Sequence, residues 1–202
     1  ELGGSAVSNL ADNMELFGLT PGSTNVFGIV YTTFGNIVKK LYPELMPSFP
    51  TVDDILDLSY LKNVVAKSGT LAAADKTTFT AGEIKEKVAE RAWNIEFESG
   101  SAKLTAKAEK DLELLFNDLI VANNLKVEIH GHTDNAGDPG KNMTLSEQRA
   151  FAVKQWLEAK SPNNFPDSRT SIHAHGQTNP LVPNDTPDGR AKNRRVTIVM
   201  GK

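Results

Sequence analysis

Residues 93–200 alternate between two spacings of apolar side chains, and this alternation limits the folds that the chain can adopt. A period of two residues is typical of strands, and a period near 3.6 is typical of helices. The strand period occurs at 93–98, 126–130, 171–175 and 194–200, and the helical period occurs at 105–122 and 144–160. The predicted order is therefore β-α-β-α-β-β. Strand–helix–strand units favour parallel pairing, so we predict an α/β (α+β sandwich) fold. Its helices pack on a mixed sheet whose last strand is antiparallel or at an edge.

The part of the chain before this pattern is predicted to be mainly helical. Apolar residues with helical spacing occur at 8–17, 25–42 and 52–58, and glycines and prolines separate them. The first 90 residues contain no arginine, and residues 66–81 are rich in Ala, Thr and Ser. These changes in composition predict a helical segment at 1–75, a linker at 76–87 and a second domain at 88–202.

Composition excludes several classes of function. The 202 residues include no cysteine, which excludes disulfides, thiolate metal sites and thiol catalysis. A net charge of −3 argues against a partner that is a nucleic acid. The sequence contains no apolar run long enough to span a membrane. The chain begins at Glu1 without a leader, so we expect it to be a piece cut from a longer exported protein.

Arg149 lies within the apolar stripe of its predicted helix, where an unpaired guanidinium would be costly. One interpretation is a structural ion pair with Asp134 or Glu147. The other is a receptor in which Asp134, at the carboxyl end of a strand, and Arg149 face one crevice. An acid and an arginine held at a fixed separation suit the ammonium and the carboxylate of an amino-acid head group.

The four histidines form two pairs, His130 with His132 and His173 with His175, each on one face of a strand. Two such pairs on neighbouring strands are compatible with a metal site, but no third ligand has motif spacing, so we predict no metal. Ser146 is a candidate nucleophile, because a catalytic triad needs a serine or a similar residue. However, no strand–turn–helix elbow presents this serine, so we predict no enzymatic activity.

Five blocks of the C-terminal part resemble a known family. They are 95–102 (IEFESGSA), 129–137 (IHGHTDNAG), 142–150 (NMTLSEQRA), 176–180 (GQTNP) and 189–196 (GRAKNRRV). In this order and with these gaps, residues 88–202 resemble the OmpA C-terminal-like domain, which is shared with peptidoglycan-associated lipoproteins and flagellar stator proteins.

The resemblance implies non-covalent binding of peptidoglycan through the diaminopimelate of its stem peptide. It implies that Asp134 takes the amino group of the ligand and that Arg149 takes its carboxylate. It also implies supporting contacts from the loop after the first strand and from three further positions. These residues are Gly100, Ser101, Thr133, Asn142 and Arg194.

The resemblance further implies a module that anchors an envelope protein to the cell wall of a Gram-negative bacterium. It would be periplasmic, associated with the outer membrane or the wall, and would need no cofactor. Residues 1–75 resemble the closing segment of periplasmic solute-binding-like proteins, and their apolar faces would then self-associate. Two alternatives remain open, a solute receptor tethered to the wall and a peptidoglycan hydrolase.

Overall fold

A computed structural model describes residues 9–67, 78–79, 82–98 and 100–202 of the chain. The chain divides into two compact units, Glu1–Thr77 and Thr78–Lys202. None of the described helices combines the length and the apolar character that crossing a bilayer requires.

The first unit is helical, as the sequence predicts. Its helices are α1 (Leu10–Leu16), α2 (Val26–Leu41), α3 (Val52–Ile55) and α4 (Ser59–Lys67). The third is shorter than predicted because the backbone becomes extended at Leu56, and the fourth was not predicted. Ala11 and Gly28 are the only buried residues among those described at 9–67. This unit therefore has little core of its own.

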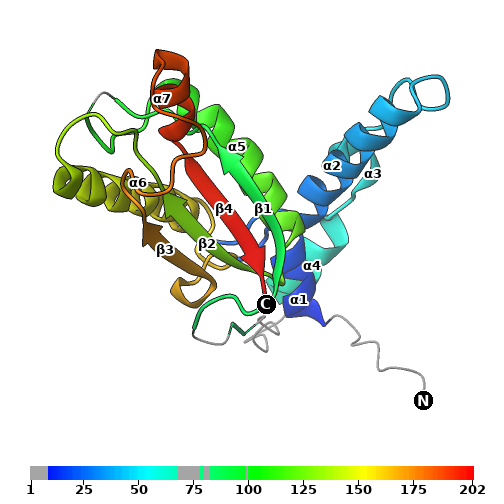
Figure 1. The fold of residues 1–202 in the computed structure, drawn as a ribbon. Coiled ribbons are helices and arrows are strands. Elements are labelled where there is room, and N and C mark those ends of the chain that lie inside the picture. Colours follow the sequence, from blue (N-terminus) through cyan, green and yellow to red (C-terminus); the bar gives the residue numbers. More distant parts are fainter. Residues whose placement is uncertain (1–8, 68–77, 80–81, 99) are drawn as a thin grey trace. The chain divides into compact units, whose positions relative to one another are not determined.

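The second unit is built on a four-stranded sheet with the order β1-β4-β2-β3 (Figure 1). The strands are β1 (Lys87–Trp93), β2 (Lys126–Gly131), β3 (Thr170–Ala174) and β4 (Val196–Gly201). β2 and β3 pair in parallel, whereas β4 is antiparallel to both β1 and β2. The predicted mixed sheet is confirmed, and the last strand lies inside the sheet rather than at its edge.

Helices α5 (Ala106–Val121) and α6 (Pro139–Lys160) cover one face of this sheet (Figure 1). A 3₁₀ turn (Asp167–Arg169) precedes β3, and a short helix, α7 (Pro187–Asn193), precedes β4. Thr105 caps α5, because its hydroxyl accepts a hydrogen bond from the backbone of Ala108. The apolar face predicted for α5 is buried and consists of Ala108, Leu112, Leu115, Phe116 and Leu119.

The first strand differs from its prediction at 93–98. It ends at Trp93, where the pairing with β4 ends at Val196. Side chains continue to alternate after Trp93, since Ile95 is buried and its neighbours are exposed, but this stretch has only an isolated bridge between Phe97 and Leu104.

β1 itself was missed because it is an edge strand with almost no buried side chain, so it lacks an apolar alternation. The residues just before β1 are also bonded to the second unit, because the backbone nitrogens of Lys85 and Glu86 donate to the carbonyl of Lys202. These residues belong to the predicted linker.

Helix α6 begins five residues earlier than the position predicted from Thr144. The side chain of Asp138 caps it by accepting a hydrogen bond of 2.9 Å from the backbone of Lys141, and Pro139 occupies the first turn. Thr144 lies inside the helix, where its hydroxyl donates to the carbonyl of Gly140. The predicted start of this helix at 144 is therefore wrong. The proline and glycine that follow Asp138 lie in the first turn of the helix.

Arg169 is the largest fully buried side chain among the described residues, with 1% of its surface exposed. Its guanidinium donates to four backbone carbonyls, those of Leu119, Ala122, Leu125 and Asn164, over 2.7–3.0 Å. Two of these carbonyls end α5, where the helix dipole favours a cation. Burial lowers the pKa of Arg169 to about 10, so the side chain remains charged and joins α5 to the start of β3.

We predict that Arg169→Met lowers the free energy of unfolding of the second unit by about 3 kcal/mol or more, because four carbonyls lose their donor. Both tryptophans, Trp93 and Trp156, lie in this unit, so urea unfolding followed by tryptophan fluorescence reports on it. Arg91→Met is the matched control, since Arg91 is exposed and pairs with Asp118; it should cost about 1 kcal/mol or less. Equal midpoints for the two variants would contradict the assigned role.

We predict self-association through the first unit, because it exposes several large apolar side chains. Leu45 is 85% exposed, Leu41 63% and Phe34 53%, and exposed apolar patches favour association. Light scattering over a concentration series should show a mass that rises with concentration. The double variant Leu41→Glu, Leu45→Glu should reduce that rise, and a parent chain that is strictly monomeric throughout would refute the prediction.

Candidate functional site

A pocket of about 680 Å³ opens in the second unit, where the predicted binding residues meet. Four segments line it: the stretch after β1, the loop after β2, the first half of α6, and the junction of α7 with β4. The lining includes six of the seven residues that the resemblance implied. They are Gly100, Thr133, Asp134, Asn142, Arg149 and Arg194.

A close contact between Gly131 and Ser146 sets the position of α6 over the ends of β2 and β3. A Cβ atom on Gly131 would lie 2.0 Å from the carbonyl oxygen of Ser146, so only glycine fits. The hydroxyl of Ser146 donates to the carbonyl of Met143 and accepts from the backbone of Gly176. Ser146 is fully buried and links α6 to the segment after β3.

Arg149 is 6% exposed, which confirms its predicted place in the apolar stripe of α6. Its Nε donates a hydrogen bond of 3.1 Å to the carbonyl of Ser101, and its guanidinium carbon lies 5.1 Å from the centroid of the Phe97 ring. Burial, and secondly the charge of Arg194, lower the pKa of Arg149. No carboxylate among the described residues forms an ion pair with it. The predicted pairing of Arg149 with Asp134 or Glu147 is therefore wrong.

Asp134 forms its ion pair with Arg194 instead. The Nη1 of Arg194 lies 2.7 Å from one carboxylate oxygen, and the backbone of Ala136 donates to the other oxygen at 3.0 Å. The carboxylate is 12% exposed and the Arg194 side chain is 46% exposed. Asp134 is thus held in place by the loop and neutralised by a partner that is accessible to solvent.

Asn142 and Thr133 support the loop that carries Asp134. The amide nitrogen of Asn142 donates to the carbonyls of Asp134 and Ala136 and to the side chain of Gln177. Asn142 therefore acts first as a positioning residue. The hydroxyl of Thr133 is buried beside the pocket and has no hydrogen-bond partner among the described residues.

The loop after β1 contributes backbone rather than side chains. Gly100 lines the pocket with a φ of +65°, a conformation that favours glycine. Ser101 contributes its carbonyl to Arg149, while its hydroxyl accepts from the backbone of Lys103. Ser99, which belongs to the same predicted loop, lies outside the described residues.

Sequence reasoning missed two residues of this site, Phe97 and Gln177. Phe97 was assigned to the apolar face of a strand, although its ring packs beside the Arg149 guanidinium. Gln177 bonds to Asn142 from a loop after β3. No spacing signal connects either residue with its partner, since each contact joins segments that are distant in the sequence.

Comparison with known proteins finds relatives of the second unit. Residues 96–194 match the OmpA family. The peptidoglycan-binding protein ArfA of Mycobacterium tuberculosis is 37% identical over 106 residues, which are 52% of this chain. The peptidoglycan-associated lipoprotein of Buchnera aphidicola is 31% identical over 105 residues, again 52% of this chain. Among solved structures, the cell wall anchor of the T6SS from Pseudomonas aeruginosa is similar, with 27% identity and a TM-score of 0.48; the match covers 55% of this chain and 78% of that one.

These matches cover part of each relative. The chain spans 32% of ArfA and 59% of the Buchnera lipoprotein. It also spans 13% of the photosystem I P700 chlorophyll a apoprotein A2 of Gloeobacter violaceus, with 35% identity over 113 residues. The family match begins after the first unit, so the predicted resemblance of residues 1–75 to solute-binding-like proteins finds no support. The similarity to the OmpA family thus covers residues 96–194, slightly less than half of the 202 residues.

Proposed function

We propose that the second unit binds peptidoglycan non-covalently through diaminopimelate and so anchors an envelope protein to the cell wall. The observation that carries this proposal is the state of Arg149. This buried arginine lines an open pocket, and no described carboxylate pairs with it. A buried cation without an anion is costly, so the pocket is suited to a ligand that supplies a carboxylate.

The second half of the recognition comes from Asp134. The free end of the diaminopimelate side chain carries an ammonium and a carboxylate on one carbon. A carboxylate placed against Arg149 would bring the ammonium toward Asp134, which lines the same pocket. Arg194 holds Asp134 in the absence of ligand and is exposed enough to move aside or to take a second ligand oxygen.

The relatives support the same assignment. ArfA is named for binding peptidoglycan, and the Buchnera lipoprotein for its association with it. By analogy with these proteins, this chain belongs in the envelope, in the periplasm beside the outer membrane or the wall. The partner recognised there is the stem peptide.

We also propose that binding occurs without hydrolysis. Hydrolysis needs an activated nucleophile or a pair of catalytic carboxylates. Two carboxylates line the described part of the pocket, and each has a cationic partner: Asp134 pairs with Arg194 and Glu96 with Lys107. The Ser146 hydroxyl is engaged by Met143 and Gly176. Release of soluble muropeptides from peptidoglycan by the chain would refute this part of the proposal.

Co-sedimentation with purified sacculi tests the site. Arg149→Ala and Asp134→Ala should each weaken binding by tens-fold, because a hydrogen bond to a charged group contributes about 1.5–3 kcal/mol. Arg149→Lys should recover only part of the loss, since lysine keeps the charge but not the planar fork.

Arg91→Ala is the matched control, because it removes the same charge from an exposed position of the same unit. It should pellet like the parent chain. Tryptophan fluorescence confirms that each variant is folded. If folded Arg149→Ala and Asp134→Ala pellet as well as Arg91→Ala, the assigned site is wrong.

A further inference from the structure

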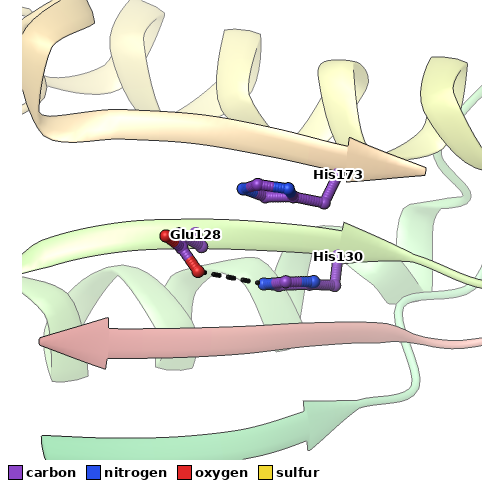
Figure 2. Close-up of side chains that lie close together, drawn as sticks. All are labelled: Glu128, His130 and His173. Atoms are coloured by element: carbon purple, nitrogen blue, oxygen red, sulfur yellow. Dashed lines mark hydrogen bonds and ion pairs between the residues drawn. The ribbon is translucent and has the colours of Figure 1, made fainter. Parts of the chain in front are cut away.

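All four histidines gather on the face of the sheet away from the helices. In Figure 2 the helices lie behind the sheet, and the side chains of Glu128, His130 and His173 lie in front of it. His130 and His173 are register partners on the parallel strands β2 and β3. The imidazole rings stack in a row: His173 on His130 at 4.6 Å, His130 on His175 at 5.1 Å, and His175 on His132 at 4.8 Å between centroids.

We propose that Glu128, His130 and His173 form a binding site for a divalent transition-metal ion, with Zn²⁺ as the reference ion. One ligand atom from each of these residues lies within 4.8 Å of the other two. The Nε2 of His130 lies 3.4 Å from a carboxylate oxygen of Glu128. Two ligand atoms of a tetrahedral zinc site lie about 3.3 Å apart, given metal–ligand bonds of about 2.0–2.2 Å. Two of the three ligands are thus already at the required separation.

The chemistry of the donor set selects the class of ion. Two imidazole nitrogens and one carboxylate oxygen favour zinc, copper or nickel over magnesium or calcium, which prefer oxygen ligands. Three protein ligands would leave one coordination position for water. The sequence-based prediction of no metal rested on the lack of a third ligand, and Glu128 supplies it from the same face of the same strand.

The surroundings of the cluster already orient two of the ligands. The second carboxylate oxygen of Glu128 accepts a hydrogen bond of 2.9 Å from the backbone of Ile84, which leaves the oxygen nearer to His130 for an ion. The Nδ1 of His130 lies 2.8 Å from the Nε2 of His175. With its proton on Nδ1, His130 would donate this bond to His175 and present Nε2 to an ion, and such a bond fixes the orientation of a metal-binding imidazole.

Binding requires a small movement of His173. Its ring is nearly parallel to that of His130, at 13°, and two stacked rings cannot both direct a nitrogen at one ion. Apart from this stacking, His173 has a contact of 3.5 Å between its Nε2 and the hydroxyl of Ser171. A tilt of this partly exposed ring therefore costs little and brings the third nitrogen to the ion.

The site is separate from the peptidoglycan pocket, because none of its three ligands lines that pocket. Isothermal titration calorimetry of the untagged full chain with ZnCl₂, after removal of metal with EDTA, tests it. We expect one ion per chain, and no comparable binding of MgCl₂. Glu128→Gln and His173→Gln should each weaken zinc binding by tenfold or more.

Asp118→Asn is the matched control. Asp118 lies on α5 and pairs with Arg91, so its substitution removes a carboxylate that the site does not use. It should bind zinc like the parent, and so should Asp134→Ala, which separates this site from the proposed pocket. The visible spectrum of the Co²⁺-substituted chain should show tetrahedral coordination that both ligand variants lose. Absence of zinc binding by the folded parent, or equal binding by all variants, would overturn the proposal.

Discussion

The binding pocket depends on one close contact, in which the Cα of Gly131 lies against the backbone carbonyl of Ser146. It brings α6 against the end of β2, and the Ser146 hydroxyl ties the same helix to the segment after β3 through Gly176. The loop that carries Asp134 follows β2 directly, and Asp134 lies three residues after Gly131, while Arg149 lies about one turn beyond Ser146 on α6. Because α6 is fixed at this point, the acid and the arginine line the same pocket although they come from different elements.

Three arginines of the second unit show three ways of accommodating a cation in a folded chain. Arg169 is satisfied by four backbone carbonyls and holds α5 to the start of β3. Arg194 is satisfied by Asp134. Arg149 has one hydrogen bond to a carbonyl and a contact with the ring of Phe97, and no described carboxylate forms an ion pair with it. Only this third arrangement leaves a charge for which an external anion is the natural partner, and the proposed function rests on that difference.

Much of this unit could be predicted from sequence because its central elements have clear periodicity. α5 shows a complete apolar stripe, and β2 alternates strictly between buried and half-buried side chains. β1 and α7 could not be predicted in the same way, since an exposed edge strand and a seven-residue helix bury too little to impose a pattern. The burial of Arg149 was predictable from its position in the stripe. The pairing of Asp134 with Arg194 was not, because it joins residues that are far apart in the sequence and are brought together by the central position of β4.

Calorimetry with two stem peptides that differ at a single residue tests the central claim most directly. One tripeptide carries meso-diaminopimelate at its third position, and the other carries lysine, which has the ammonium but lacks the second carboxylate. If Arg149 binds that carboxylate, the diaminopimelate peptide should bind tens-fold more tightly, by about 1.5–3 kcal/mol. Arg149→Ala should abolish the difference between the two peptides. Equal affinity of the parent chain for both peptides would contradict the account.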